Sequence, residues 1–244
     1  MLKSIADCTC RSTLDNIRIL VSYNGDDDEA IKAVQKQSPV KFEWFKDTYN
    51  FAKNCNMLAK IGEGTSDKLL FLNDDVELKT DAITHCIKIL DDNPVVGTVG
   101  IKLLFPDGTI QHGGHILFYK DRKFVGVTHL LLKQQDRELN DIFTVGNTGA
   151  FLMVRRADFN KVGGFDERFE RCFEDVVLNW KILISGKINV TALSQTAIHH
   201  ESTTRDRALS QDDIQHMVSF FNENIDKILY YKDVVRPTIQ EIRK

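Results

Sequence analysis

Apolar and polar residues alternate over the first hundred positions in a pattern that predicts strands and helices in turn. Apolar runs bounded by polar or turn residues predict three strands, over 17–23, 40–46 and 68–73. Apolar residues at helical spacing predict three helices, over 26–37, 50–62 and 80–93. Thr80 is expected to cap the third helix, which Pro94 ends. Such alternation is typical of a doubly wound α/β half with right-handed crossovers, in which the third run would be a central strand.

The pattern changes after Pro94, where extended segments replace the regular alternation. Residues 120–141 are polar and predict a loop, whereas 211–230 predict an amphipathic helix. The remaining apolar patterns predict extended segments over 95–105 and 109–119, strands over 149–156 and 187–193, a short helix ending at Gly163-Gly164, and a helix over 174–185. Because neither an internal repeat nor a linker interrupts the chain, one domain over 1–244 is preferred.

The composition is that of an ordinary globular protein. The 244 residues are 42% apolar and 27% charged, which excludes a disordered chain, and the formal net charge of −3 lacks the basic excess of nucleic-acid binders. Five cysteines without a CxxC pair predict reduced thiols in the cytoplasm. The N-terminus lacks the apolar core of a signal peptide, and no run approaches the ~18 apolar residues of a membrane span. The sequence therefore predicts a soluble chain, and a larger parent protein could still be membrane-attached.

The first candidate for chemistry is the acidic segment that follows the third apolar run. Asn73, Asp74 and Asp75 come directly after it, where the carboxyl ends of strands line the ligand crevice of an open α/β sheet. Carboxylates in that position can hold a hard divalent cation, which in turn binds phosphate oxygens. The alternative is a solvated acidic turn, and the motif alone leaves both open.

The second candidate is an acid pair at the predicted start of a helix. Asp175, preceded by Glu174, would be favoured in its charged form by the helix N-terminus and could serve as a general base. Taken alone, Asp175 is as well explained as a helix cap, and the two interpretations are compatible.

The third candidate is a pair of histidines after a short strand. His199 or His200 could complete a metal site begun by a carboxylate elsewhere, and Arg205 and Arg207 could bind phosphate. Surface or hydrogen-bonded histidines and solvated arginines are the alternatives.

Other catalytic signatures are missing from the sequence. The segment GNTGAF (146–151) has neither the GxGxxG spacing of dinucleotide-binding folds nor a following P-loop lysine, and no GxSxG is present. His112 and His115 flank two glycines without the spacing of known metal-ligand motifs, so core or loop roles are expected for them.

Taken together, these pieces resemble family 2 nucleotide-sugar glycosyltransferases with the GT-A fold, and most closely the rhamnosyltransferase-like enzymes of bacterial surface polysaccharide assembly. The similar segments are NFAKNCN (50–56), KLLFLNDDVEL (68–78), VVGTVGIKLLFPDGTIQHGG (95–114), TGAFLMVRR (148–156), VGGFDERF (162–169), FEDVVLNWKI (173–182) and IHHESTTR (198–205). Their order and spacing match from about residue 17 to residue 232. The resemblance implies a Rossmann-like α/β fold with a mixed, mostly parallel sheet and helices on both faces. It divides the chain into a nucleotide-sugar-binding half (1–94), an acceptor and catalytic half (95–210) and a C-terminal helical segment (211–244).

The resemblance also implies a donor site at the acidic segment. Residues 73–75 take the place of the family's DxD motif, with Asp75 as the metal-binding carboxylate and Asp74 near the ribose or sugar. Asn73 replaces the usual first acid and is placed with the substrate-binding residues. His199 matches the histidine of the family's HxES-like segment near the metal and diphosphate, and His200 is the alternative if the register shifts by one.

On the acceptor side, Asp175 matches the base of the family's ED motif, with Glu174 beside it as a further catalytic residue. Thr148 and Gly149 would line the acceptor side of the crevice, and Asn24 is placed among the substrate-binding residues. The expected outcome is that Asp75, Asp175 and His199 face one another across a single cleft.

Two features depart from the family's pattern. The segment MLKSIADCTCRST (1–13) looks like the tail of the family's first helix, so the first βα unit is expected to be truncated and the chain to be part of a larger multidomain protein; in an alternative register, residues 17–24 are the first strand. Tyr23 stands where an Asp usually contacts the base, and Asp26, Asp27 or Asp28 is expected to substitute for it.

The resulting hypothesis is a metal-dependent inverting glycosyltransferase. Mg²⁺ or Mn²⁺, held by Asp75 and His199, would bridge the donor diphosphate, and the mixed ligand set favours Mn²⁺. Asp175 would deprotonate an acceptor hydroxyl as that oxygen attacks the anomeric carbon from the opposite face. The expected partners are a nucleoside-diphosphate sugar and a glycan or lipid-linked saccharide, without nucleic acid or a transmembrane segment. The expected place is the cytoplasm, peripheral to the inner face of the membrane.

Two alternatives remain at the level of sequence. A non-catalytic, glycosyltransferase-like binding or scaffold domain is suggested by the missing first strand and by Tyr23. A metal-dependent nucleotidyltransferase would share the acidic ligands, but it would need a basic, Gly-rich loop for a triphosphate, and the sequence has none.

Overall fold

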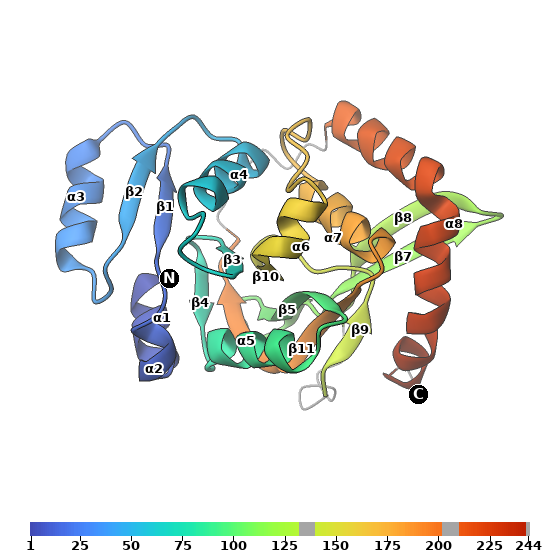
Figure 1. The fold of residues 1–244 in the computed structure, drawn as a ribbon, viewed down its shortest axis with the longest axis horizontal. Helices are drawn as coiled ribbons and strands as arrows, with labels where there is room; N and C mark the ends of the chain where they lie inside the picture. The colour runs from blue at the N-terminus through green and yellow to red at the C-terminus, as the bar shows by residue number, and fades with distance from the viewer. Residues whose placement is uncertain (132–139, 202–209, 243–244) are drawn as a thin grey trace.

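The chain folds into sheets that are covered by helices, as the computed structural model in Figure 1 shows. The structure describes residues 1–131, 140–201 and 210–242, with side chains up to Tyr230. Its N-terminal elements are α1 (Leu2–Cys8), α2 (Arg11–Leu14), β1 (Leu20–Tyr23), α3 (Asp28–Gln37), β2 (Glu43–Lys46) and α4 (Phe51–Ile61).

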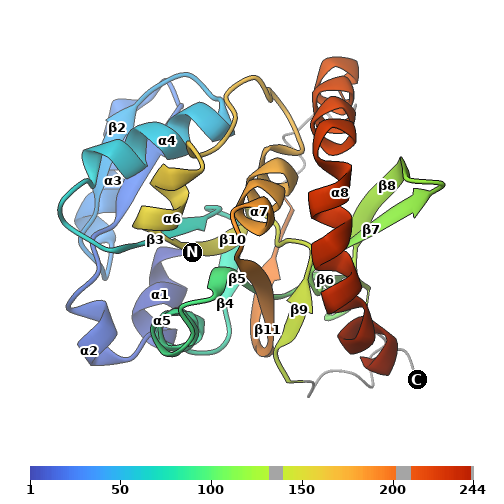
Figure 2. The ribbon, with the colours of Figure 1, turned by 45° about the vertical axis from the view of Figure 1, so that its right-hand side comes forward.

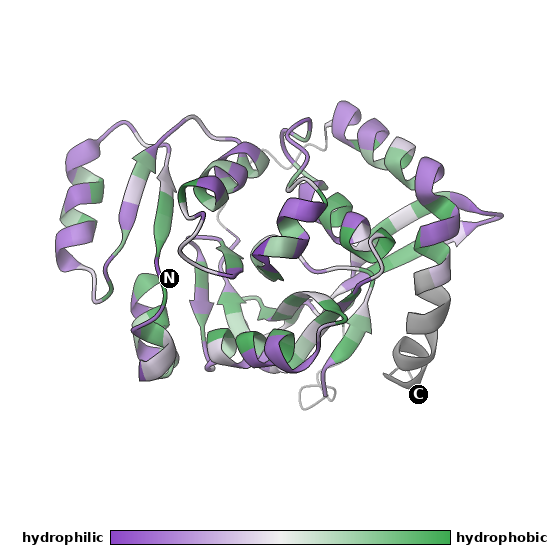
Figure 3. Cartoon of the chain, in the orientation of Figure 1, coloured by the Kyte–Doolittle hydropathy of each residue, from purple (hydrophilic) through white to green (hydrophobic). Residues whose placement is uncertain are grey.

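The strands β1 and β2 form a separate, two-stranded parallel sheet in which Leu20 pairs with Glu43 and Tyr23 with Lys46. Helix α3 follows β1 because Asp27 caps it, accepting hydrogen bonds from the backbone N–H groups of Glu29 and Ala30. Figure 3 shows this helix with hydrophilic residues on its outer side and apolar ones toward β2. A parallel βαβ unit thus forms at this end of the molecule.

A seven-stranded sheet forms the centre of the molecule. Its strands are β3 (Lys68–Leu72), β4 (Val76–Leu78), β5 (Val96–Leu104), β6 (Ile110–His112), β9 (Ile142–Thr144), β10 (Phe151–Arg155) and β11 (Ile188–His199). The order along the main path is β3-β10-β5-β11-β4, with β6 beside β5 and β9 beside β11. Strands β5 and β11 are parallel, and β10 runs antiparallel to both β3 and β5, so β3, β5 and β11 point in one direction.

Helices cover both faces of this sheet. The side chains of β10 therefore alternate between two cores, one on each face. Phe151 and Met153 face the core under α5 (Ala82–Asp92). Leu152 and Val154 face the core formed with α4, α6 (Arg156–Lys161) and α7 (Glu174–Ile184). The carboxyl ends of β3 and β11 are thereby left at one edge, beside α7.

A hairpin and a long helix complete the C-terminal part of the described chain. Strands β7 (His115–Lys120) and β8 (Lys123–His129) pair antiparallel, with His115 opposite His129. Helix α8 (Gln211–Ile242) runs alongside α7 and this hairpin, as Figure 2 shows. Phe124 of β8, Trp180 of α7 and Phe221 of α8 pack against one another at the contact. None of the helices in the described ranges combines the length and the apolar character of a membrane span.

Most predicted elements are present, and the mixed α/β class with helices on both faces is confirmed. Three details were wrong. The run 68–73 gives β3, which ends the strand order rather than lying at its centre. The cap of α5 is Asp81, whose side chain accepts from the Thr84 N–H, rather than Thr80. Within the predicted loop 120–141, residues 123–129 form β8, whose polar residues mark a half-exposed strand.

Candidate active site

Two adjoining hollows lie at the carboxyl ends of the strands. The larger is a cleft of about 2540 Å³, and its lining includes six of the predicted site residues: Asn24, Asn73, Asp74, Asp75, Thr148 and His199. The smaller is a pocket of about 190 Å³ whose walls include Glu174 and Asp175. Both hollows share Thr128, His129, Arg171 and Cys172, so one opens beside the other.

Asp75 and His199 meet inside the larger cleft. The turn after β3 carries Asp75, and strand β11 carries His199 at its end; β4 pairs with β11, with Val76 opposite His199. The backbone N–H of His200 donates to the Asp75 carbonyl (3.0 Å). As a result, Asp75 Oδ1 lies 3.1 Å from His199 Nε2, and the two side chains are 17% and 14% exposed.

This pair fits a divalent cation. Nδ1 of His199 lies 2.7 Å from Oε1 of Gln111, while the amide nitrogen of Gln111 donates to Glu201. Since an amide oxygen only accepts, Nδ1 must carry a proton, and Nε2 is left as the nitrogen that faces the Asp75 carboxylate and that could bind a metal in the neutral ring. A lone pair and a carboxylate oxygen that face each other form a ligand set for a metal, with Gln111 orienting the ring in the manner of outer-shell residues.

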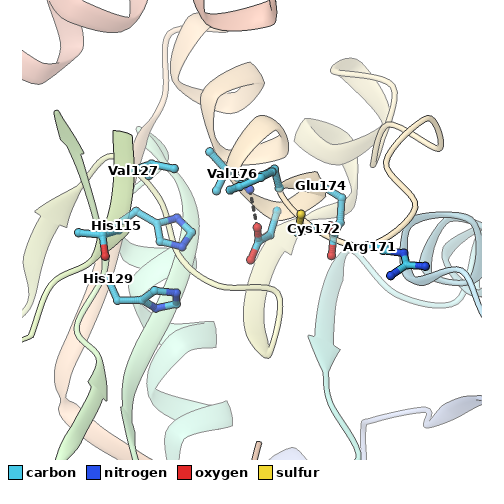
Figure 4. Close-up of a pocket in the computed structure, with 10 residues that line it drawn as sticks. His115, Val127, His129, Arg171, Cys172, Glu174 and Val176 are labelled. Carbon is cyan, nitrogen blue, oxygen red and sulfur yellow. Dashed lines mark hydrogen bonds between the residues drawn. The ribbon is translucent and has the colours of Figure 1, made fainter. Parts of the chain in front are cut away.

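Asp175 is fixed in the first turn of α7 at the wall of the smaller pocket. Its Oδ2 accepts from the Gly149 N–H (2.8 Å) and its Oδ1 from the Val176 N–H (2.7 Å), the second of which is drawn as a dashed line in Figure 4. The helix N-terminus stabilises its negative charge. Phe173, not Asp175, occupies the N-cap position, so the interpretation of Asp175 as a plain helix cap is wrong. A carboxylate held in this way at a pocket wall can accept a proton from a bound hydroxyl.

The segment before α7 is held in a strained conformation. Phe173 adopts the left-handed region with φ of 72°, which is unfavourable for a bulky residue by about 1–3 kcal/mol. The buried carboxylate of Asp213, in α8, accepts hydrogen bonds from the backbone N–H groups of Glu170, Arg171 and Cys172. These bonds hold the strained segment in place and thereby position the N-terminus of α7.

A buried amide network connects α7 to the loop that carries Gly149. Asn179 donates to the carbonyls of Asn147 and Asp175, and its own Oδ1 accepts from Thr98. Asn147 in turn donates to the Val190 carbonyl and accepts from the Thr191 hydroxyl. Because every polar group in such a network needs its partner, the network sets the distance between Gly149 and Asp175. The sequence patterns considered above carry no signal for it.

Three histidines gather beside Asp175. His112, His115 and His129 each place a ring nitrogen within 4.8 Å of the others, a grouping that could hold a metal ion. Burial lowers the pKa of all three rings, that of His115 to about 4, so they are neutral at pH 7. His112 and His115 are buried, as a core role requires. The hairpin also brings His129 to them, and the sequence spacing of His112 and His115 did not reveal this cluster.

The residues expected to replace the base-contacting Asp do not line the cleft. Asp27 caps α3 and Asp28 pairs with Lys46, whereas Tyr23 and Asn24 are at the cleft wall. The Tyr23 hydroxyl donates to the Asp27 carbonyl (2.6 Å). None of the three acids lines the cleft, so its geometry does not support the expectation that one of them substitutes for the base-contacting Asp.

The other predicted residues are placed as follows. Asp74 is exposed at the cleft, and Gly149 meets Asp175 through its N–H group. His200, the alternative to His199, is 50% exposed beside Glu77. Arg205 and Arg207 lie outside the described residues.

A family model and two known proteins are similar to this chain. The model of the family "Glycosyl transferase family 2" matches residues 1–163. The O-antigen biosynthesis protein RfbC of Myxococcus xanthus is 32% identical over 203 residues, which are 77% of this chain and 15% of RfbC. An N-acetylglucosaminyl-diphospho-decaprenol L-rhamnosyltransferase of Mycobacterium tuberculosis is 26% identical over 217 residues, which are 79% of this chain and 70% of that protein.

A solved structure shares the fold. The crystal structure of GalNAc-T7 with UDP, GalNAc and Mn²⁺ superposes with a TM-score of 0.60 at 13% identity, over 80% of this chain and 39% of that one. At this identity the likeness shows the fold alone. The chain thus spans about 15% of the length of RfbC and 39% of the GalNAc-T7 chain.

Proposed function

We propose, since this chain belongs to glycosyl transferase family 2, that it transfers a sugar from a nucleoside-diphosphate donor to an acceptor hydroxyl with inversion at the anomeric carbon. One observation carries the proposal. An acid–imidazole pair, Asp75 and His199, lies in a large cleft, and a fixed carboxylate, Asp175, lines the pocket that adjoins it. Donor and acceptor would thus meet where the two hollows join.

The donor occupies the larger cleft. Its nucleotide lies near the ends of β1 and β3, where Tyr23, Asn24, Asn73 and Asp74 line the cleft. Asp75 and His199 hold a divalent cation, Mn²⁺ or Mg²⁺, and the mixture of imidazole and carboxylate favours Mn²⁺. When bound, the cation neutralises charge on the leaving nucleoside diphosphate. Gln111 accepts a hydrogen bond from Nδ1 of His199, so Nε2 is the nitrogen that would bind the cation in the neutral ring.

The acceptor occupies the smaller pocket, where Asp175 acts as general base. Its carboxylate takes the proton of the acceptor hydroxyl as that oxygen forms a bond to the anomeric carbon and the bond from this carbon to the diphosphate oxygen breaks. Gly149 and Val176, through their N–H groups, keep the carboxylate in place and stabilise its charge before the reaction. Glu174, which is buried, is a second acidic residue at the wall of the same pocket.

The names of the relatives support a role in surface polysaccharide assembly. One is an O-antigen biosynthesis protein, and the other transfers rhamnose to a lipid-linked, N-acetylglucosamine-containing acceptor. A glycan or lipid-linked saccharide is therefore the proposed acceptor, and the cytoplasmic side of the membrane is the place where such a reaction would occur.

The test is donor turnover by the purified chain. Incubation with UDP-, GDP- and dTDP-sugars and Mn²⁺ should release nucleoside diphosphate from at least one of them, with water or an added saccharide as acceptor. Asp175→Asn should reduce this release by about 10²–10⁴-fold, since a positioned general base contributes that much, while calorimetry shows unchanged donor binding.

Asp212→Asn, an exposed acid at the start of α8, is the matched control and should turn over like the wild type. Release by Asp175→Asn within a factor of a few of the wild type would remove Asp175 from the role of base. Donor binding without release by the wild type would identify a non-catalytic binding domain and contradict the proposal.

A further inference from the structure

The three histidines beside Asp175 contain a chain of hydrogen bonds that starts at the backbone. The N–H of Thr148 points at Nε2 of His112 (3.3 Å), and Nδ1 of His112 lies 2.6 Å from Nδ1 of His129. The backbone group can only donate, so Nε2 of His112 must accept.

This hydrogen bond determines the tautomers of both rings, His112 and His129. Burial lowers the pKa of His112 and His129, so each ring is neutral at pH 7 and carries one proton. In His112 that proton sits on Nδ1, because Nε2 accepts. The short contact with His129 is then an Nδ1–H···Nδ1 hydrogen bond in which His129 accepts, so the proton of His129 sits on Nε2. His129 is therefore a donor at the nitrogen that faces away from His112.

His129 lies where the two hollows join. His129 lines both the large cleft and the small pocket, and part of it is exposed. Figure 4 shows its ring and that of His115 reaching from the hairpin toward Cys172 and Glu174 on the opposite wall. His115 lines the small pocket as well, and its Nδ1 is buried without a hydrogen-bond partner among the described residues.

The charge of the small pocket indicates the kind of ligand that it binds. With the histidines neutral, the remaining ionisable side chains among the lining residues include one basic group, Arg171, and two acidic groups, Glu174 and Asp175, so acidic groups outnumber basic ones. Such a wall disfavours an anionic ligand. Imidazole donors opposite carboxylate acceptors suit a molecule with several neighbouring hydroxyl groups, each of which both donates and accepts.

We propose, building on the proposed function, that the small pocket binds the acceptor as an uncharged sugar unit. His129 donates its Nε2–H to a hydroxyl beside the one that Asp175 deprotonates, and His112 is the positioning residue that fixes the tautomer of His129. The pocket thereby selects neutral over acidic sugars and holds the reacting hydroxyl toward Asp175.

The tautomers are tested first, by NMR of protein labelled with ¹⁵N in its imidazole rings. Long-range ¹⁵N–¹H correlations at pH 7 should show His112 protonated at Nδ1 and His129 at Nε2, with assignments from His112→Asn and His129→Gln. The opposite tautomer of His129 would overturn the proposal. So would stoichiometric Zn²⁺ binding that shifts all three rings, because a metal would replace the hydrogen bond between His112 and His129.

The ligand is tested on the same samples. Methyl glycosides of neutral hexoses are the probes, with methyl glucuronide as the anionic counterpart. At least one neutral glycoside should shift the His129 and His115 ring signals, and the glucuronide should not. His129→Leu should weaken that binding about fivefold, the value of one typical hydrogen bond, whereas His129→Gln, which keeps an N–H group near the same place, should restore most of it.

These outcomes separate the inference from the proposed function. No ring shift with any neutral glycoside, or an equal shift with the glucuronide, would overturn the inference even if nucleoside diphosphate is released normally. Ring shifts in a protein that turns over no donor would support the sugar subsite and remove the transferase proposal.

Discussion

At the scale of single residues, two adjacent histidines at the end of β11 lie in different surroundings. Successive side chains of a strand point to opposite sides, so His199 enters the cleft and meets Asp75, whereas His200 stays 50% exposed near Glu77. The sequence predicted the pair but left open which of the two faces the donor. The geometry favours His199.

Exchanging each histidine for glutamine measures this difference. His199→Gln removes one of the two proposed ligands, so Mn²⁺-dependent binding of nucleoside diphosphate should weaken at least about tenfold in calorimetry, the lower end of what even outer-shell changes cause. His200→Gln is the matched control and should bind like the wild type. Equal losses in both variants, or a loss in His200→Gln alone, would contradict the assignment of His199 rather than His200 as the ligand.

At the scale of elements, the N-terminus of α7 is held by segments that are distant in sequence. Asn179 connects it to the loop 146–149, and Asp213 of α8 holds the segment 170–172 in front of it. Neither residue belongs to a recognisable motif, so both escape an analysis based on sequence. They position Asp175 without contacting the pocket themselves.

Removing the Asp213 carboxylate should therefore destabilise the protein. Asp213→Ala leaves three backbone N–H groups without their acceptor, and we expect a loss of about 2–5 kcal/mol in the free energy of unfolding, measured with denaturant. Asp212→Ala, one residue away and exposed, should change it by less than about 0.5 kcal/mol. Similar values for the two variants would show that the bonds to residues 170–172 contribute little.

Strand β8 and the histidine cluster were not predicted from the sequence, and both have the same physical reason. Apolar runs predicted β10, which is buried on both faces, and β3, whose residues are half-buried or buried. Strand β8 is half-exposed and carries polar residues, so its pattern resembles a loop. Its pairing with β7 and its packing against α7 and α8 stabilise it. The histidine cluster depends on that pairing, and for this reason it could not be predicted.

At the scale of the whole molecule, the sequence predicted residues that line the large cleft but not what holds the adjoining pocket beside it. Asn73, Asp74, Asp75 and His199 follow the ends of strands, and such positions converge at one edge of a sheet. Asp175 lines an adjoining pocket, a relation that only the packing of α7 determines. Local motifs thus predict candidate residues for the site, while long-range packing decides how they meet.

The buried histidines should make global stability depend on pH. The folded pKa of His115 is about 4 and the ordinary value is 6.5, so between these values the unfolded chain binds a proton that the folded protein does not. The free energy of unfolding should accordingly fall as the pH drops from about 6.5 toward 4, by up to about 1.4 kcal/mol per pH unit for one ring. His112 and His129 act in the same direction.

Denaturant unfolding at several pH values checks this dependence. His115→Gln should flatten the decline between pH 6.5 and 4, whereas His200→Gln, at an exposed position, should leave the slope as in the wild type. An unchanged slope in His115→Gln would show that this ring takes up its proton without unfolding.

The most direct measurement of the central claim is calorimetric titration of the chain with a panel of nucleoside diphosphates, with and without Mn²⁺. We predict that at least one binds only when the metal is present, that Asp75→Asn abolishes this binding, and that Asp175→Asn retains it. Absence of metal-dependent binding across the whole panel, or its persistence in Asp75→Asn, would contradict the account.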